Sequence, residues 1–397
     1  MLHQRSKLIQ NIFSHYAKRF SKTKPKIGPL TNPATKNLTS NSQEMADILQ
    51  DQYCSVFTPP KLIVSALDSN QTEENTLLEE IIFTEEDIIR EIDTINTTSA
   101  AGPDGLPAIF FKMCKKSLAK PLKIIWQSNF NRGTTPLLLK TSHITPVFKS
   151  GDQGAPENYR PVALTSITSK IFEKIVRNKM HNYLEDKNLY NSTQHGFRPG
   201  RSCLSQLLAH VERLTFNLQN DENVDAIYLD FSKAFDKVDH AILLQKLQNI
   251  GIRGQLLNWL KSFLTERVQK VSVNTFLSYE STVISGVPQG SVLGPVLFLI
   301  MISDIDENVK HSILSSFADD TRLMKSIAAA ADIVLLQEDL DSVYEWTTKN
   351  NMSLNGTKFV HLTYGKNQEL ISCSTYRSDT GEDISTKDVV KDLGAFK

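Results

Sequence analysis

The chain has 397 residues, of which 40% are hydrophobic and 22% are charged, so it can bury sizeable cores in roughly two or three domain-sized units. These values exclude a wholly disordered chain, a coiled coil and a collagen-like repeat. The net charge is zero, but the charges are separated: residues 101–201 hold 16 basic and 6 acidic residues, and residues 202–397 hold 18 basic and 25 acidic residues. That separation is typical of a polyanion-binding surface beside a metal site, and equally of ordinary solvated surface.

The cysteines and the apolar segments indicate where in the cell the protein is expected. The four cysteines are far apart and form no CxxC pair, which argues against a disulfide framework and against a cysteine zinc site. The first ten residues lack an apolar core of signal-peptide length, and the longest apolar run, 292–302, contains a proline and is too short to span a bilayer. The sequence therefore predicts an intracellular protein without a membrane partner.

The first quarter of the chain divides into an arm and a connector. Residues 1–43 hold 8 basic residues and no acidic residue, and their later part is rich in Lys, Thr, Pro, Asn and Ser, which predicts a basic mobile arm or linker. Residues 44–98 are expected to form a helical connector. An apolar spacing indicates one helix over 42–57, and Thr84, followed by three acidic residues, indicates the start of another.

The rest of the chain mixes helical and strand patterns. Helices are predicted over residues 117–130, 166–186, 203–219, 240–250, 254–265, 291–303 and 331–348. Strands are predicted over residues 143–148, 162–165, 224–229, 268–273, 313–317, 321–325 and 359–364. This order predicts an α+β fold in which most strands pair with partners that are distant in the sequence.

Asp230 stands at the end of an apolar strand pattern, in the segment IYLDFSKAFD. A carboxylate at the end of a buried strand is held on a rigid element, which suits a metal ligand. The same position is also typical of a helix N-cap. For Asp230 taken alone, the N-cap interpretation is favoured.

Asp319 and Asp320 stand in a predicted turn between two apolar strands, in the segment FADDT. Adjacent like charges repel each other and are costly to bury unless a cation compensates them. Aspartate is also simply a good turn residue. The pair alone therefore carries little weight, and its placement in a hairpin carries more.

Two further segments offer polar groups to a ligand. In SGVPQGSVLGP, glycines recur every four residues before an apolar helix; glycine lets a backbone or a ligand approach closely, and Gln289 both donates and accepts hydrogen bonds. A basic stretch carries Lys149, Arg160, Arg198 and Arg201 near glycine-containing turns, where such side chains can clamp phosphates. Taken singly, the first segment is equally a helix-entry loop, and the second is usually solvated surface.

The order of these segments is stronger evidence than any one of them. From about Thr98 to Gly394 the chain resembles the reverse transcriptase domain of non-LTR (LINE-type) retrotransposons, most closely the jockey-type elements. The blocks that carry the resemblance occur in the family's order and read NYRPVALTS, QHGFRPGRS, DFSKAFDKVDH, SGVPQGSVLGPVLFL, FADDT, LNGTK and KDLG.

This resemblance implies a right-hand polymerase fold. The fingers are expected at 99–225, and the palm, with an antiparallel sheet packed on helices, at 226–365. Residues 366–397 are expected to form the end of the palm, and the chain stops before the thumb that follows in this family. Only about 98 residues precede the matching region, too few for the endonuclease domain of such elements. A longer form is expected to supply an endonuclease or a thumb.

The resemblance also implies the catalytic residues. Asp230, Asp319 and Asp320 correspond to the carboxylates that hold two Mg²⁺ ions, with Mn²⁺ as an alternative, and Phe231 is assigned to the same metal and nucleotide site. Two such ions about 3.5–4 Å apart stabilise the attacking and leaving oxygens of an in-line displacement. Lys358 is a candidate acid or electrostatic partner for the leaving pyrophosphate.

The substrate-binding roles follow from the same resemblance. Lys149 and Arg160 would grip the incoming triphosphate, and Phe235 would block a ribose 2′-hydroxyl and so favour deoxynucleotides. Gln289 and Gly290 would line the nucleotide and template pocket. The other two acidic residues of DFSKAFDKVDH, at positions 236 and 239, are more simply explained as helix caps or surface residues.

The function expected on this basis is RNA-directed DNA polymerisation, with an RNA template, a DNA primer or target and deoxynucleoside triphosphates as partners. Because this family copies its RNA at a nicked chromosome, the protein is expected in the nucleus, in the cytoplasm or in both. One alternative is a truncated, non-catalytic nucleic-acid-binding remnant of such an element. Another is a relative such as an intron-encoded maturase, which fits the palm motifs but fits KAFDKVDH and SVLGPVLFL less well.

Overall fold

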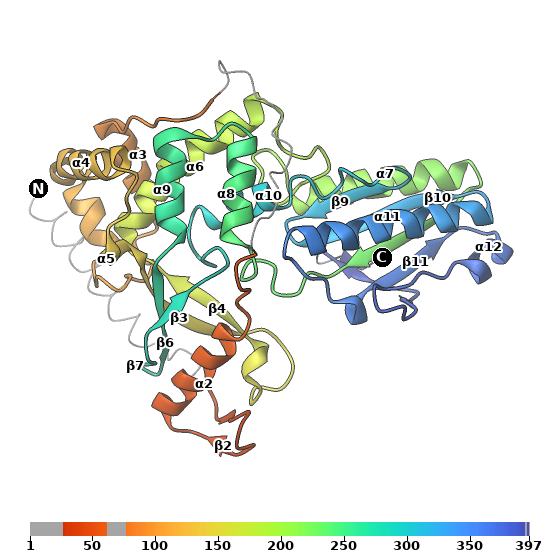
Figure 1. Cartoon of the computed structure of the whole chain (residues 1–397), viewed down its shortest axis with the longest axis horizontal. Helices are drawn as coiled ribbons and strands as arrows, with labels where there is room; N and C mark the ends of the chain where they lie inside the picture. The colour runs from red at the N-terminus through yellow and green to blue at the C-terminus, as the bar shows by residue number, and fades with distance from the viewer. Residues whose placement is uncertain (1–26, 62–76, 394, 397) are drawn as a thin grey trace, which may run out of the picture.

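The computed structural model describes residues 27–61, 77–393, 395 and 396, and every structural statement below concerns these residues. They form two lobes that lie side by side along the longest axis of the molecule (Figure 1). One lobe combines a helical bundle with a five-stranded sheet, and the other is a second five-stranded sheet with helices packed on it. This architecture confirms the predicted α+β class.

The first lobe contains strands that are remote in sequence. Its helices are α3 (Glu85–Asp93), α4 (Ala108–Asn131), α5 (Leu137–Lys140), α6 (Ile167–Asp186), α8 (His240–Asn249) and α9 (Gly254–Leu264). Its strands are β3 (Thr141–Phe148), β4 (Tyr159–Leu164), β6 (Arg267–Val273), β7 (Phe276–Leu277) and β8 (Ser281–Val283). The sheet order is β4–β3–β6–β7, with β8 also paired to β6. Because β3 and β6 run parallel, a long crossover separates them, and the chain visits the second lobe in between.

Helix α2 (Ser42–Cys54) packs against the sheet of the first lobe (Figure 1). Asn41 caps α2 by accepting hydrogen bonds from the backbone N–H groups of residues 43 and 44. Tyr53 and other apolar side chains of α2 pack against Val271 and Val273 of β6. Before α2, β1 (Leu30–Thr31) pairs with β2 (Leu38–Thr39), and residues 1–26 of the expected basic arm lie outside the described part of the chain.

The second lobe is built on a five-stranded sheet whose central strand is β5. The order is β12 (Ser385–Thr386), β11 (Val360–Tyr364), β5 (Asn223–Leu229), β10 (Asp320–Ile327) and β9 (Ile313–Phe317). All neighbours are antiparallel except β11 and β12. The helices of this lobe are α7 (Cys203–Gln219), α11 (Ala330–Lys349) and α12 (Gln368–Cys373), and α10 (Gly294–Met301) lies where the lobes meet. None of the described helices combines the length and apolarity needed to cross a membrane.

Alternation along β5 sends its side chains to two different cores. Val224 and Ala226 pack with Leu214 of α7 on one face of the sheet. Ile227 and Leu229 point to the opposite face and join the main core, to which α11 contributes Leu336, Leu340 and Val343. The central strand is therefore fixed from both sides, which makes its end a rigid platform.

Aromatic packing holds the helices of the first lobe together. Trp126 of α4 stacks on Phe172 of α6 with ring centroids 5.2 Å apart. Phe172 in turn meets Trp259 of α9 edge-on at 4.8 Å. Each of the three side chains is almost fully buried, so removal of any one ring would cost about 3–5 kcal/mol of stability.

Each predicted helix and strand is present with shifts at several boundaries, whereas short elements such as α5, β7, β8 and α12 were not predicted. Helix α4 begins at Ala108 rather than near 117, because Pro107 starts it without any side-chain cap that the sequence could reveal. Helix α10 begins at Gly294 rather than 291. The reason lies in Glu173, whose carboxylate accepts the N–H groups of Val292 and Leu293 at 2.7 and 3.2 Å and so holds the preceding residues as a loop.

A buried polar network joins β5 to its neighbour β11 and to the C-terminal segment. The carboxylate of Asp225 is fully buried; Tyr376 donates a hydrogen bond to its Oδ2 at 2.6 Å, and His361 Nε2 lies 3.4 Å from its Oδ1. Burial alone would raise the pKa of Asp225, but the contacts with His361 and Tyr376 outweigh burial and lower this pKa below its usual range.

Tyr376→Phe should lower the free energy of unfolding by about 1–3 kcal/mol, because it leaves a buried carboxylate short of a donor. A carboxyl group with a lowered pKa stabilises the fold above its unfolded pKa of about 4 and loses that contribution as the pH falls through the folded pKa. The deficit in urea unfolding should therefore be largest at neutral pH and shrink in acid. Tyr279→Phe, which alters an exposed tyrosine bonded to Asp51, is the control; an equal loss there would contradict this account.

Candidate active site

Asp230 follows the last residue of β5, and the backbone around it is held by the segment 353–355. The carbonyl of Asp230 accepts the N–H of Asn355 at 2.8 Å, and the N–H of Ser232 donates to Ser353 at 2.9 Å. Asp230 caps no helix; its Oδ2 instead accepts a hydrogen bond from Lys358 Nζ at 3.0 Å. The N-cap interpretation of Asp230 is therefore wrong, and its carboxylate is presented at the sheet edge.

Asp319 and Asp320 lie at the tight turn of the β9–β10 hairpin. Phe317 pairs with Asp320, so only two residues form the turn, and Ala318 takes a positive φ of 56°. Another segment braces the turn from behind: the N–H of Ala318 donates to Gln194 Oε1 at 2.9 Å. A Cβ on Gly196 would lie 2.3 Å from Ala318 N, so only glycine permits this approach.

The sheet register brings the two segments together. The last residue pair between β5 and β10 is Leu229 with Thr321, so Asp230 and Asp320 stand one position beyond it at the same edge. The residues predicted for the site, except Gly290, line one open cleft: Lys149, Arg160, Asp230, Phe231, Phe235, Gln289, Asp319, Asp320 and Lys358. This cleft encloses ≈ 1540 Å³, open solvent included, which leaves room for a nucleotide.

The carboxylates in the cleft carry the electrostatic signature of a cation site. Desolvation, followed by the nearby charges of Asp319, Asp392 and Asp230, raises the pKa of Asp320 to about 6. Desolvation also raises the pKa of Asp319, with a further contribution from Asp230 and an opposing one from Arg160. Neighbouring carboxylates that resist ionisation gain the most from a divalent cation.

The carboxylate oxygens of the cleft are donors of the type that a hard cation binds. Carboxylate oxygens on rigid strands are the ligands that Mg²⁺ prefers. Within the described residues, no group of three or more His, Cys, Asp or Glu side chains is arranged to hold a metal ion. The ammonium group of Lys358 lies against Asp230 instead and offsets one of the negative charges.

Opposite the carboxylates, the cleft has a basic wall that comes from the first lobe. Lys149 follows β3, where its N–H donates to Asn158 O at 2.9 Å, and Arg160 lies on β4. Both residues line the same cleft as Asp319, and their positive charges oppose the rise in the pKa of Asp319. The other two arginines of the predicted basic stretch lie elsewhere: Arg198 pairs with Glu185 at 2.8 Å, and Arg201 lines a different pocket.

The two aromatic residues predicted for the site have different surroundings. Phe235 stacks on Phe298 of α10 with centroids 4.4 Å apart and meets Phe197 edge-on at 6.2 Å, so its ring is held beside the cleft. The side chain of Phe231 is 6% exposed and packs edge-on against Trp346 of α11. Phe231 can therefore take part in the site mainly through its backbone.

The glycine-rich loop lies against β4. The N–H of Ala163 donates to the carbonyl of Gln289 at 2.6 Å, and a Cβ on Gly290 would lie 2.5 Å from Ala163 O. Gly290 adopts a φ of 118° and lies outside the lining of the cleft. Its role is close backbone approach, whereas Gln289 presents its side chain to the cleft.

Sequence reasoning did not place Asp236 in the site, although it lines the cleft. Asp239 caps α8 by accepting the N–H groups of Ala241 and Ile242, which confirms the expectation of a helix cap. The same expectation for Asp236 is wrong: Asp236 caps no helix, is partly buried, and accepts two hydrogen bonds from Gln289 in the cleft wall. The six-residue spacing from Asp230 gave no sign of this contact, because the partner lies in a distant loop.

Comparison with known proteins gives this geometry a family context. Residues 147–394, more than half of the chain, match the model of the family described as reverse transcriptase (RNA-dependent DNA polymerase). The chain is 30% identical over 290 residues to the RNA-directed DNA polymerase from mobile element jockey of Drosophila melanogaster, covering 70% of this chain and 31% of that protein.

Two further relatives extend the match. One is the probable RNA-directed DNA polymerase from transposon BS of Drosophila melanogaster, 26% identical over 338 residues, which cover 82% of this chain and 37% of the relative. The other is the jockey polymerase of Drosophila funebris, 27% identical over 360 residues, which cover 87% of this chain and 39% of the relative. The chain thus spans between 31% and 39% of the length of these curated relatives.

Proposed function

The chain belongs to the reverse transcriptase family, and on that premise we propose that it is an RNA-directed DNA polymerase of a non-LTR, jockey-like retrotransposon. The reaction is transfer of a deoxynucleotide from its triphosphate to the 3′-hydroxyl of a primer. One observation carries the proposal. Carboxylates from two distant strands share a cleft with a basic wall from the other lobe, and that cleft can accommodate a nucleotide.

The carboxylates are assigned to metal binding. Asp230, Asp319 and Asp320, with the backbone of Phe231, would hold two Mg²⁺ ions, and Mn²⁺ could replace Mg²⁺. When bound, such ions neutralise charge that develops on the oxygens during phosphoryl transfer. The strand ends supply rigidity, so these side chains need little reorganisation to act as ligands.

The remaining residues of the cleft are assigned to the substrate. Lys149 and Arg160 bind the triphosphate, since their cationic side chains face the carboxylates across the cleft. Lys358 stabilises the leaving pyrophosphate as a proton donor or as a charge. Phe235 excludes a 2′-hydroxyl, and Gln289 contacts the nucleotide or the template.

The two lobes are assigned to fingers and palm. We place the fingers at 99–225 and the palm at 226–365, with 366–397 as its end, although α7 (Cys203–Gln219) packs with the second lobe and residues 240–283 pack with the first. The partners follow from this assignment: an RNA template, a DNA primer or target, and deoxynucleoside triphosphates. The nucleus is the compartment in which copying onto a chromosome would occur.

Primer extension tests the proposal. The chain should extend a DNA primer on an RNA template with deoxynucleoside triphosphates and Mg²⁺, and EDTA should abolish extension. RNA binding that weakens with salt, without any incorporation in Mg²⁺ or Mn²⁺, would instead support the non-catalytic alternative. An inactive preparation must still melt cooperatively for that conclusion to hold.

A further inference from the structure

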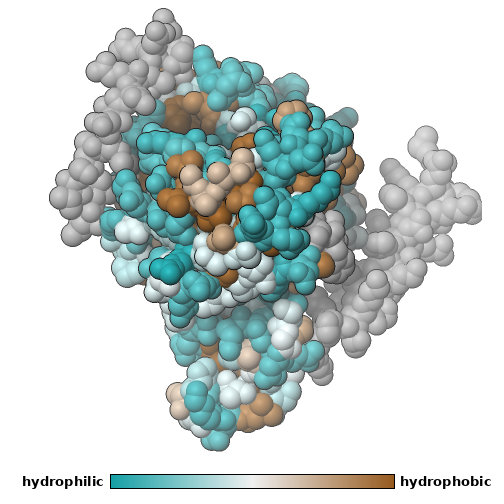
Figure 2. All heavy atoms as spheres, turned by 90° about the vertical axis from the view of Figure 1, so that its right-hand side faces the viewer, coloured by the Kyte–Doolittle hydropathy of each residue, from teal (hydrophilic) through white to brown (hydrophobic). Residues whose placement is uncertain are grey.

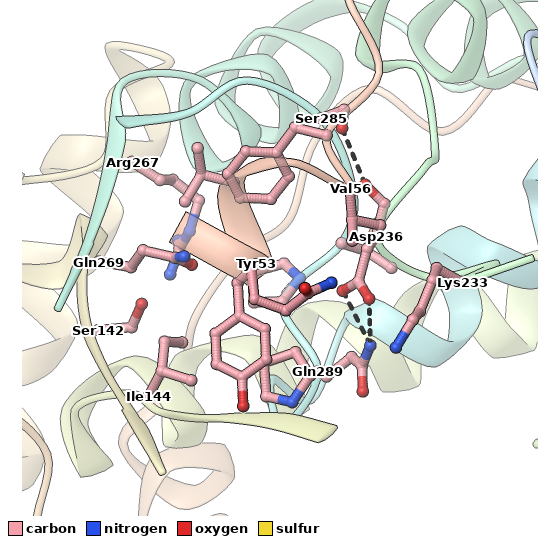
Figure 3. A pocket seen from close by; sticks show the side chains of 17 residues that line it. Tyr53, Val56, Ser142, Ile144, Lys233, Asp236, Arg267, Gln269, Ser285 and Gln289 are labelled. Carbon is pink, nitrogen blue, oxygen red and sulfur yellow. Dashed lines mark hydrogen bonds between the residues drawn. The ribbon is translucent and has the colours of Figure 1, made fainter. Parts of the chain in front are cut away.

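Asp236 and Gln289 line the catalytic cleft and also a second pocket, which Figure 3 shows from close by. The second pocket is also lined by Tyr53 of α2 and Arg267 of β6, among others. Gln289 Nε2 donates to Asp236 at 2.8 Å from Oδ1 and 2.9 Å from Oδ2. The orientation of the Gln289 amide group is therefore set by Asp236, which lies in the DFSKAFDKVDH segment.

The backbones that carry the two side chains are fastened to each other. The N–H of Val287 donates to the carbonyl of Phe235 at 2.8 Å, and Ser285 Oγ donates to the carbonyl of Asp236 at 2.8 Å. Gly286 has a φ of 86°, and a Cβ there would lie 2.7 Å from Asp236 O. Because both loops are fixed, the contact between Asp236 and Gln289 is part of a rigid unit.

An ionised carboxylate can only accept hydrogen bonds, so it dictates which end of an amide faces it. Burial raises the pKa of Asp236 to about 6, although the hydrogen bond from Gln289 and the charge of Lys233 oppose that rise. The carboxylate is therefore ionised at neutral pH. The NH₂ group of Gln289 must face Asp236, and its Oε1 is left to point away from the carboxylate.

We propose that Asp236 is a positioning residue that fixes the amide of Gln289, so that Gln289 presents only an acceptor oxygen to a hydrogen-bond donor of the bound nucleotide. The inference rests on the proposed function, because it assumes that the cleft binds a nucleotide. It adds a specificity role for Asp236, which acts through Gln289 and touches no reacting atom.

Variants that exchange the carboxylate of Asp236 and the amide of Gln289 provide the test. In Asp236→Asn the amide of Gln289 is free to turn, and we expect the KM for deoxynucleotide to rise about tenfold while kcat stays within about threefold. In Gln289→Glu two carboxylates face each other, and the KM should rise at least as much. In the double variant the new asparagine donates to the new glutamate, which again offers an acceptor oxygen to the cleft. The KM should then return to within about threefold of the wild-type value.

The outcomes are distinct. Single variants that leave KM unchanged, or a double variant whose KM rises by the product of the two single effects, would overturn the proposal. Asp239→Ala is the control: loss of the α8 cap should lower the melting temperature without changing KM, which separates positioning from general destabilisation.

A binding measurement keeps this test separate from that of the proposed function. The dissociation constant of a fluorescent deoxynucleoside triphosphate can be measured on a primer–template whose primer ends in a dideoxynucleotide, so no incorporation is needed. The same pattern of loss and recovery is expected there. If nucleotide binding follows this pattern across the wild type and the variants but the wild type never extends a primer, the proposed function fails and the positioning role stands. Weakened binding in the double variant would overturn the positioning role alone.

Discussion

Asp319→Asn combined with Asp320→Asn should reduce RNA-templated primer extension by at least about 10³-fold. The charge stabilisation that metal ions supply in phosphoryl transfer is worth several kcal/mol, and each 1.36 kcal/mol is a factor of ten in rate. Asparagine keeps the shape of the hairpin turn, in which the N–H of Ala318 is bonded to Gln194. The loss should therefore appear in kcat in a single-nucleotide incorporation assay, with the fold intact.

The same double variant should be at least as stable as the wild type. The pKa of Asp319 is raised and that of Asp320 is raised to about 6, so ionisation of these two carboxyl groups costs the folded state free energy. Removing these charges removes that cost, and the melting temperature at pH 7.5 should rise. Extension at the wild-type rate by a variant that melts normally would contradict the catalytic assignment.

Phe235→Ala should raise the relative use of ribonucleotides by about 10- to 100-fold, the range over which a change of pocket shape alters discrimination. The ring of Phe235 is clamped between Phe298 and Phe197, so it cannot move aside for an added hydroxyl group. Alanine leaves an open space at this position. The quantity to measure is the ratio of kcat/KM for a ribonucleotide to that for the matching deoxynucleotide, since this ratio does not depend on the folded fraction.

Phe216→Ala is the matched control for this experiment. Phe216 lies on α7, is 65% exposed and lies outside the lining of the cleft, so its removal should leave the ratio unchanged. An unchanged ratio in Phe235→Ala would remove the gating role. An equal rise in both variants would show that loosening of the fold, and not the shape of the cleft, admits ribonucleotides.

The sequence-based expectations succeeded where local pattern and chain order carry the information. Asp230 follows a strongly apolar run, and the strand β5 forms where the run predicts it. The apolar strands around Asp319 and Asp320 give the hairpin in the same way. Antiparallel pairing of β5 and β10 then brings the three acids to one edge, and that pairing follows from burial of both faces of β5.

They failed where a partner comes from a remote segment. Asp236 was expected to be a cap or a surface residue because no local pattern identifies Gln289 as its partner. Arg198 belongs to a basic stretch that could clamp phosphates or simply be solvated surface, and no local pattern showed that it pairs with Glu185 on the preceding helix. The parallel pairing of β3 with β6 could not be predicted from local pattern either, because between these two strands the chain passes through the second lobe.

The arrangement of the lobes makes the cleft a composite of both. The acidic wall stands on the end of β5 and on the β9–β10 turn, whereas Arg160 comes from the sheet of the first lobe and Lys149 is the residue that follows its strand β3. The face of the second lobe turned to the viewer in Figure 2 mixes hydrophilic residues with a hydrophobic area. Because the basic and acidic walls come from different lobes, a change in the angle between the lobes would alter the distance between these walls. Substrate binding is thus linked to the relative position of the lobes.

The central claim is that Asp230 and Asp319–Asp320 jointly hold divalent cations. A crystal of the chain grown with Mn²⁺, primer–template and deoxynucleotide would test it through the anomalous signal of manganese. We expect a peak that contacts carboxylate oxygens of both Asp230 and Asp319, at roughly the 2 Å typical of small hard cations such as Mg²⁺, and that disappears in Asp230→Asn. Manganese bound to only one of these two segments, or bound equally well in that variant, would contradict the account.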